Sequence, residues 1–303
     1  MILRELAESE LLARMRGAGI VLSTGPFVVR IGSSIRELAA PMRLLYGDHS
    51  LAREDGVVDA DVRIDPPPSL RRWIAPQVIA YIDGERPFHP FPRRLAFPML
   101  EWVLNWCLFN RPHQYLILHA AVVERGGRAL LLPGEPGAGK STLCAGLILR
   151  GWRLLSDEVA IVRPSTGELL AVPRPVALKE ESLEVIRSFE PAAVLGPSFP
   201  ETRKGTVTHL RPPPDSVFRS HEAATARWIV FPRYETGAET RLQSVRKAET
   251  LLRAGRNGFN YSLLGAAGFE SLADLVDACD GYDLVYGRLH EAVEHLTALA
   301  KVV

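Results

Sequence analysis

The segment at residues 130–142 constrains this chain more than any other part of its sequence. It reads LLLPGEPGAGKST, an apolar run followed by a glycine-rich turn and the start of an amphipathic stretch. The turn matches G-x-x-x-x-G-K-[ST], a pattern that binds phosphates when it joins a strand to a helix. Glycines let successive backbone N–H groups converge on phosphate oxygens, and the helix start adds its positive dipole end. The segment therefore predicts a nucleotide-phosphate site in an α/β fold.

Two side chains of this motif have separate predicted roles. Lys140 can reach the β- and γ-phosphates of a nucleotide, and the Ser141 hydroxyl can ligate Mg²⁺. We therefore expect ATP and Mg²⁺ as the cofactors. The predicted nucleotide-binding residues are Gly134, Glu135, Pro136, Gly137, Ala138, Gly139, Lys140, Ser141 and Thr142.

Strand and helix patterns surround the motif. Apolar runs typical of buried strands lie at residues 115–123, 128–132, 153–162, 169–172 and 228–231. Helical periodicity covers residues 141–150, 180–188, 247–254, 270–278 and 289–299. Mixed strands and helices around one strand–loop–helix unit indicate an α/β domain.

The N-terminal region has a different pattern. Short β-branched runs lie at residues 20–23, 27–31, 57–64 and 77–82, and Asp83-Gly84 indicates a hairpin turn. We expect a smaller β-rich domain at residues 1–94 and the P-loop nucleotide-binding domain at residues 95–303. The Pro-rich segment 87–92 marks this boundary, and residues 95–109 are expected to form a buried helix beneath the nucleotide domain.

Composition narrows the function classes. The 303 residues are 47% hydrophobic and 23% charged, as in ordinary soluble globular proteins. A formal net charge of +1 argues against a general nucleic-acid or membrane-surface binder. The three cysteines lack metal-ligand spacing, so we expect reduced core thiols and a cytoplasmic protein. The N-terminus mixes acids and bases too freely for a signal peptide, and no apolar stretch is long enough to span a bilayer.

An acidic pair follows one of the apolar strands. Asp157 and Glu158 come directly after residues 153–156. Adjacent acids there can divide the work of phosphoryl transfer, one orienting a hydroxyl nucleophile and the other holding Mg²⁺. The alternative is a solvated strand end. His119 lies inside an apolar strand, where a lone histidine is more often a core residue.

Together these residues resemble the catalytic domain of HPr kinase/phosphorylase, a bacterial serine kinase whose P-loop fold is related to phosphoenolpyruvate carboxykinase. That family has a His-Gly strand, then a Walker A loop, then a Val-Ala-Asp-Asp strand end. The counterparts here are His119-Ala120, residues 134–141 and residues 155–158. The separations of His119 from Lys140 and of Lys140 from Asp157 look the same as the family's. Ala120 and Glu158 depart from the family's glycine and second aspartate.

The chain is more similar still to the group called HprK-related kinase A, over most of its length from about residue 95. Similar stretches include LEWVLNWC, YLILHAAVVER, RGWRLLSDEVAIV, KGTVTHLRPPPDSV and FNYSLLG. Members of this group are described as accompanying a small PqqD-like protein and a nucleotidyltransferase-like protein. Residues 253–257 also resemble an Arg-Pro-Gly-Arg-Asn run of the HPr kinase family.

The resemblance implies a role for each site residue. Asp157 would be the general base, His119 would lie beside the transferring phosphate, and Lys140 would neutralise its charge. Glu158 and Ser141 would serve Mg²⁺. Asp157 and Glu158 could exchange these roles.

The leading hypothesis is an ATP- and Mg²⁺-dependent P-loop kinase that acts on a Ser/Thr hydroxyl of a small protein or peptide. A small-molecule kinase on the same site and a nucleotide-sensing module without transfer stay open as alternatives. Lys204 lies in a polar stretch, residues 200–212, that we interpret as a mobile lid; the roles of Arg233 and Arg256 stay open. A homo-oligomer stays open too, because HPr kinase is a hexamer but its N-terminal domain differs from this one.

Overall fold

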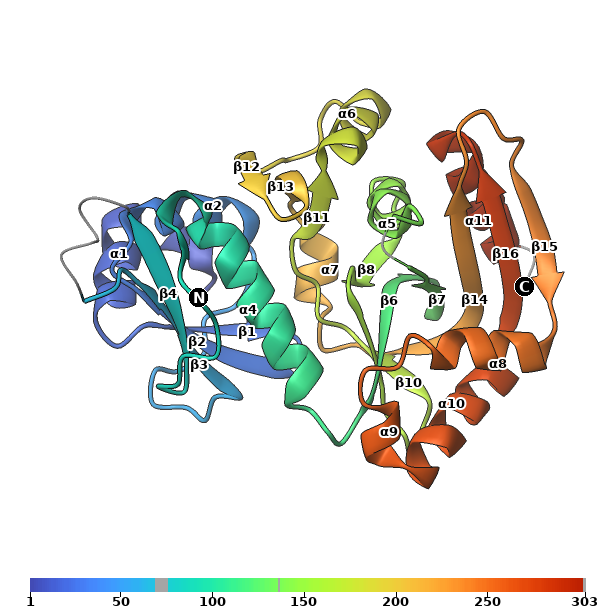
Figure 1. The fold of residues 1–303 in the computed structure, drawn as a ribbon, viewed down its shortest axis with the longest axis horizontal. Helices are drawn as coiled ribbons and strands as arrows, with labels where there is room; N and C mark the ends of the chain where they lie inside the picture. The colour runs from blue at the N-terminus through green and yellow to red at the C-terminus, as the bar shows by residue number, and fades with distance from the viewer. Residues whose placement is uncertain (69–75, 136, 302–303) are drawn as a thin grey trace.

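A computed structural model of the chain describes residues 1–68, 76–135 and 137–301. Its strands form three sheets of five, eight and three strands. Figure 1 shows two bodies side by side, an N-terminal one in blue and teal and a larger one in green to red. The predicted mixed α/β class is confirmed.

The first sheet belongs to the N-terminal body and has the order β1-β2-β3-β4-β5. Its strands are β1 (Ile20–Thr24), β2 (Phe27–Ser33), β3 (Ala60–Asp65), β4 (Gln77–Ile82) and β5 (Phe91–Pro92). The strand predictions for this region are confirmed. Asp83 and Gly84 have φ angles of 50° and 85°, and Ile82 and Glu85 exchange two backbone hydrogen bonds across them. This is the predicted hairpin turn.

Helices pack against this sheet and form a hydrophobic core with it. They are η1 (Leu3–Glu5), α1 (Glu8–Arg16), η2 (Arg36–Leu38), α2 (Ala39–Leu45), η3 (Arg93–Leu95) and α4 (Ala96–Asn110). Within the described residues, none of the helices is both long and apolar enough to cross a membrane.

Helix α4 is the buried helix expected near residues 95–109, but the expected partner was wrong. Phe97, Leu100 and Val103 share a core with Ile31 and Val62 of the first sheet. The helix is apolar around most of its circumference, so its sequence does not indicate which neighbour it packs against. In the structure α4 lies between the two bodies (Figure 1). The division between residues 94 and 95 stays a prediction.

The second sheet has the order β10-β9-β6-β7-β14-β16-β15, with β8 also paired to β6. Its strands are β6 (Leu116–Arg125), β7 (Arg128–Pro133), β8 (Arg153–Ser156), β9 (Val159–Val162), β10 (Glu168–Leu170), β14 (Ala224–Tyr234), β15 (Arg241–Val245) and β16 (Asp280–Tyr286). Strands β7, β14 and β16 are parallel neighbours. The single strand predicted at residues 153–162 is instead two strands, because the chain bends at Asp157 and Glu158.

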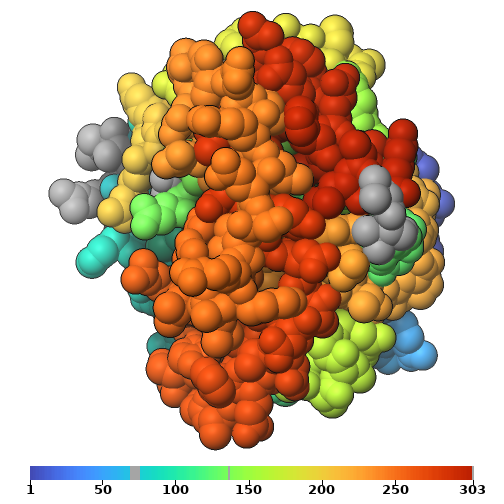
Figure 2. Space-filling view, turned by 90° about the vertical axis from the view of Figure 1, so that its right-hand side faces the viewer, coloured from blue at the N-terminus to red at the C-terminus, as the bar shows by residue number. Residues whose placement is uncertain are grey.

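Helices cover both faces of this sheet. Alternate residues of a strand point to opposite faces, so Ala121 and Val123 of β6 pack in one core while Ala120 and Val122 pack in the other. The first core contains α5 (Lys140–Ile148), α6 (Glu180–Phe189) and α11 (Leu289–Lys301). The second core contains α8 (Lys247–Gly255), α9 (Tyr261–Leu264) and α10 (Ala266–Ala278). Figure 2 shows these C-terminal segments, orange to red, covering one side of the molecule.

The third sheet has the order β11-β13-β12. Its strands are β11 (Val176–Lys179), β12 (Phe199–Thr202) and β13 (Gly205–Leu210). The loop expected over residues 200–212 was wrong for most of that length, because β12 and β13 form a hairpin whose second strand pairs along β11. A lid role for this segment stays a prediction. This pairing joins segments far apart in sequence, and a local pattern of polar residues does not reveal it.

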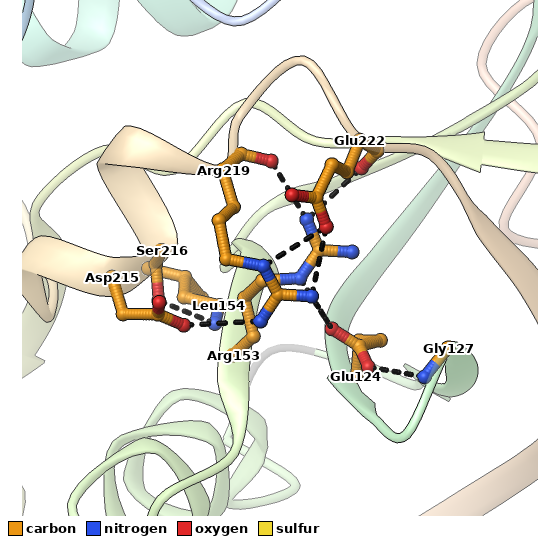
Figure 3. Close-up of polar contacts among 8 residues, drawn as sticks. All are labelled: Glu124, Gly127, Arg153, Leu154, Asp215, Ser216, Arg219 and Glu222. Carbon is orange, nitrogen blue, oxygen red and sulfur yellow. Dashed lines mark hydrogen bonds and ion pairs between the residues drawn. The ribbon is translucent and has the colours of Figure 1, made fainter.

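A buried ion pair joins the second sheet to α7 (Pro214–Phe218) and the turn after it (Figure 3). Arg153 and Glu124 form a charge-assisted hydrogen bond, and their side chains are only 3% and 2% exposed. Arg153 also donates to the backbone oxygens of Arg219 at 2.8 Å and Glu222 at 2.9 Å. The buried charges are thus both paired, which is the condition for tolerating them in a core.

Candidate functional site

The glycine-rich loop lies at an edge of the second sheet where several strands meet. Strand β7 ends at Pro133, paired with Ala120 of β6, and α5 begins at Lys140. Because β6 is antiparallel to β7, His119 lies one residue beyond that end. Strand β8 is antiparallel to β6 in turn, so the residues after Ser156 reach the same edge. The loop, His119 and the acidic pair are brought together by this topology.

The loop requires glycine at position 139 for two reasons. Gly137 and Gly139 have φ angles of 94° and 89°, in the left-handed region that favours glycine. A Cβ atom on Gly139 would lie 2.3 Å from Tyr286 Oη and 3.3 Å from Tyr234 Cβ. Tyr286 also donates a hydrogen bond to the Gly139 carbonyl at 3.2 Å. Pro136, predicted to bind nucleotide, lies outside the described residues.

Lys140 is held over the loop. Its amino group donates to the carbonyl oxygens of Gly134 and Glu135, at 3.1 Å for Glu135. Burial lowers the pKa of Lys140, although the charges of Glu158 and Asp157 oppose this shift. The two carbonyls are neutral partners for a largely buried ammonium group. An anion placed in the loop would supply the countercharge that they lack.

Asp157 is a buried carboxyl group directly behind the loop. Burial, together with the charge of Glu158, raises the pKa of Asp157 from 3.8 to about 7. The Ser141 hydroxyl and the Ala177 backbone N–H face the carboxyl group and offset part of this rise. Among the described residues, however, neither Asp157 oxygen has a hydrogen bond of normal geometry. An unpaired buried carboxyl group is costly and indicates a functional position.

Glu158 has different neighbours. Its Oε2 lies 3.3 Å from His119 Nε2, and both side chains are 25% exposed. Burial raises the pKa of Glu158, but the His119 hydrogen bond and the charges of Lys204 and Lys140 outweigh it, so the pKa is lowered. At neutral pH Glu158 is therefore ionised, whereas Asp157 is near its midpoint. Opposite shifts in neighbouring acids are typical of sites that divide two chemical roles.

A C-terminal segment that sequence reasoning did not identify as part of the site orients His119. The His119 backbone N–H donates to the Asn257 carbonyl at 2.7 Å, and the Ile117 N–H donates to Asn260 Oδ1 at 2.9 Å. The Phe259 ring lies 5.6 Å from the His119 ring. Residues 257–260 thus run along the part of β6 that extends past β7. The signal in the sequence that could have identified this segment was the resemblance of residues 253–257 to an Arg-Pro-Gly-Arg-Asn run of the HPr kinase family.

The cations left open by the sequence have different surroundings. Arg233 pairs with Glu235 at 2.9 Å, and the Arg256 backbone N–H donates to the Leu252 carbonyl at the end of α8 at 3.3 Å. Lys204 instead lines the cavity that contains the loop.

A cavity of about 680 Å³ brings these groups together. Gly137, Gly139, Lys140, Ser141 and Thr142 of the loop line it, with His119 and Glu158. Asp157 lies instead on an adjoining space of about 20 Å³, which also contacts Glu158 and Ala177. That volume is close to the minimum for one water molecule.

The wall of this cavity opposite the loop comes from the N-terminal body. It includes Pro98 and Trp102 of α4, and the Trp102 side chain is 41% exposed. The sequence did not predict that α4 would line the site, because the helix is distant from the loop in the chain.

The residues around Ser141 fit Mg²⁺ bound together with a nucleotide. Among the described residues, no group of three or more His, Cys, Asp or Glu side chains could hold a metal by itself. Mg²⁺ at nucleotide sites takes only one or two protein carboxylates and completes its shell with phosphates and water. The unpaired Asp157 oxygens facing the Ser141 hydroxyl are the donor set that such a site needs.

Comparison with known proteins finds similarity over a short segment. No family model matches the chain. The HPr kinase/phosphorylases of two Clostridium botulinum strains, Eklund 17B and Alaska E43, are each 42% identical to it over 53 residues. This segment is 18% of the chain and 17% of each relative, so the match spans less than a fifth of their length. The chain is thus similar in part to HPr kinase/phosphorylase, and the narrower resemblance to HprK-related kinase A stays a prediction.

Proposed function

We propose that this chain is an ATP- and Mg²⁺-dependent kinase that phosphorylates a Ser/Thr hydroxyl of a small protein or peptide. One observation carries the proposal: Lys140, Ser141, His119 and Glu158 line a single cavity, and Asp157 lies directly behind Ser141. The partial similarity to HPr kinase/phosphorylase supports a kinase-like activity.

The loop would hold the nucleotide. Backbone N–H groups of residues 137–142 and the Lys140 ammonium would bind the phosphates, as the positive end of α5 favours. Mg²⁺, when bound, would neutralise charge on the phosphate oxygens. Ser141 and an acidic neighbour would hold it.

The resemblance implies Asp157 as the general base and Glu158 as the Mg²⁺ ligand. The environments of the two acids favour the opposite assignment. Asp157 faces the Ser141 hydroxyl and does not line the main cavity, which suits the metal side. Glu158 lines the cavity and contacts His119, which suits a group that orients the acceptor. Phosphoryl transfer has a loose transition state, so orientation matters more than basicity, and the lowered pKa of Glu158 is compatible with this role.

These groups account for each bond that forms or breaks in the transfer step and for the proton that is released. The acceptor oxygen forms a bond to the γ-phosphorus, and the bond from that phosphorus to the β–γ bridging oxygen breaks. ADP leaves with the bridging oxygen. The acceptor hydroxyl proton passes to the Glu158 carboxylate, whose position is set by His119.

The wall opposite the loop supports a protein or peptide acceptor. Phe91, Leu95, Pro98 and Trp102 make this side of the cavity partly apolar. A site for a small polar metabolite would instead surround it with polar groups. For this reason we rank a small-molecule kinase below a protein or peptide kinase.

The test is transfer of label from ATP carrying a labelled γ-phosphate to a small protein encoded beside this chain. Lys140→Ala should abolish nucleotide binding. Glu158→Gln should keep the Kd for ATP but lower transfer at least ~100-fold, and Asp157→Asn should weaken nucleotide binding only when Mg²⁺ is present.

The exposed Glu184→Gln serves as the control, because it changes a carboxylate on α6 outside the proposed machinery. Label that appears only as free phosphate, at a rate unchanged by Asp157→Asn and Glu158→Gln, would contradict the kinase proposal. It would favour the nucleotide-sensing reading.

A further inference from the structure

We propose that Lys204 is a second phosphate-binding residue, which contacts the γ-phosphate from the side of the cavity opposite Lys140. This inference rests on the proposed nucleotide site and extends it to the β12–β13 hairpin. Where the sequence indicated a loop that acts as a mobile lid, the structure has the turn of a β-hairpin that carries a cation.

The backbone around Lys204 is held in place. Thr202 Oγ1 donates to the Gly205 carbonyl at 2.6 Å and accepts from the Lys204 N–H at 3.1 Å. Gly205 has a φ of 81°, and Glu201 has a φ of 57°, which is unusual for a residue with a side chain. A turn that sustains such a conformation is determined by its surroundings.

Those surroundings come from both bodies of the molecule. Strand β13 pairs along β11, next to the loop and α5. On the other side Arg94 forms an ion pair with Glu201, and the rings of Phe97 and Phe199 stack with centroids 5.9 Å apart. The hairpin is therefore anchored on α4 and η3 as well as on the third sheet, and its turn lies over the cavity.

The Lys204 side chain makes no direct polar contact with the part of the chain that the structure describes. Within the described residues, its amino group has no hydrogen bond or ion pair, and the side chain is exposed on the cavity wall. Its charge has a larger effect on the pKa of Glu158 than the charge of Lys140 has, and it also lowers the pKa of Lys140. Lys204, Lys140 and Glu158 all line the same cavity.

An anion between these groups would relieve the repulsion between the two ammonium groups. Lys179 also lowers the pKa of Lys140, so three cations act on one region, which also holds the carboxyl groups of Glu158 and Asp157. A terminal phosphate carries about two negative charges and offers three acceptor oxygens. Lys204 lines the same cavity as Glu158, the acid on the acceptor side, so we assign it to the phosphate that is transferred and not to the two that remain in ADP.

The experiment compares two nucleotides on the full-length protein with Mg²⁺. We would measure the Kd of ADP and of an ATP analogue whose β–γ bridge is an imido group. Lys204→Gln should weaken the analogue by about 10-fold, the size expected for one charge-assisted contact. The Kd of ADP should change by less than about twofold, and Lys204→Arg should retain most of the affinity for the analogue.

Arg233→Gln is the matched control, because it removes one exposed positive charge beside Tyr234, which lies against Gly139 of the loop. If Lys204→Gln weakens the binding of both nucleotides equally, or if Arg233→Gln weakens the analogue as much, the charge acts on the site only through its general electrostatic field. Either result would overturn the assignment. An unchanged ratio of the two Kd values would overturn it as well. If Lys140→Ala abolishes binding while Lys204→Gln has no effect, the Lys204 inference fails and the nucleotide site stands. If the unaltered protein binds neither nucleotide, both fail.

Discussion

At the scale of single residues, Asp157 and Glu158 show how neighbours in the chain can differ chemically. The bend between β8 and β9 turns Asp157 toward Ser141 and the interior, and it turns Glu158 toward His119 and the cavity. Burial is the largest single influence on both carboxyl groups, but at Glu158 the His119 hydrogen bond and the nearby cations together outweigh it. Their pKa values therefore shift in opposite directions.

The raised pKa of Asp157 makes a prediction about stability. Its pKa is about 7 in the folded protein against 3.8 as the unperturbed value. The folded state thus holds the proton more tightly, and the free energy of unfolding falls as pH rises from about 4 to 7. Asp157→Asn should flatten this dependence, so that without nucleotide its Tm declines less from pH 5 to pH 8 than the Tm of the unaltered protein. Calorimetric scans across this range check the result.

The exposed Asp274→Asn on α10 provides the control, because it removes a carboxylate that is already in water. Parallel Tm curves for Asp157→Asn and the unaltered protein would contradict a proton held by Asp157.

Gly139 provides a second test at this scale. Alanine there would combine an unfavourable φ of 89° with a Cβ only 2.3 Å from Tyr286 Oη. We expect Gly139→Ala to weaken nucleotide binding at least ~10-fold, because the loop must shift to remove the clash. Gly126→Ala is the comparison, since its φ is 62° but nothing lies within 4 Å of the added atom. Nucleotide affinity that is equal in both variants would contradict this account.

At the scale of elements, most strands and helices around the glycine-rich loop could be predicted from periodicity. Strands β6 and β7 and helices α5, α6, α8, α10 and α11 lie where the patterns indicated them. Apart from the bend that divides β8 from β9, two errors fall where partners are distant in the chain. Strand β13 depends on β11, and the apolar face of α4 depends on the first sheet. Local sequence does not specify such partners.

The buried ion pair of Figure 3 allows a prediction at this scale. Glu124→Ala would leave Arg153 charged and only 3% exposed, without its carboxylate partner. We expect the free energy of unfolding to fall by about 3–5 kcal/mol. Glu184→Ala removes a carboxylate from an exposed pair with Arg187 and should have little effect. Urea denaturation of both variants makes the comparison. Similar midpoints would show that the buried pair stabilises the fold no more than the exposed pair does.

At the scale of the whole molecule, a buried polar network joins the two bodies behind the site. Arg174 donates to Asn105 of α4 and lies 3.8 Å from Glu101, which in turn accepts a hydrogen bond from the Tyr46 hydroxyl at 2.6 Å. His49 donates to the Pro173 carbonyl at 2.8 Å, and burial lowers the pKa of His49 to about 4. The N-terminal body is thus coupled to the segment between β10 and β11.

This coupling predicts that the chain unfolds in one transition. Calorimetry should show a single peak, and ATP with Mg²⁺ should move the entire peak to higher temperature, because a ligand at about 100 times its Kd adds about 2.7 kcal/mol to the folded state. Two peaks, of which the nucleotide moves only one, would contradict the coupling.

The sequence alone determined the glycine-rich loop, the strand and helix on either side of it and the spacing of His119 and Asp157 around Lys140. These features are local, because they depend on backbone freedom and periodicity within short segments. Only the tertiary structure decided that α4 faces the loop, that Lys204 lies on a fixed turn, and that Asp157 and Glu158 have different surroundings. Those outcomes depend on burial and on contacts between distant segments, and no short stretch of sequence encodes them by itself.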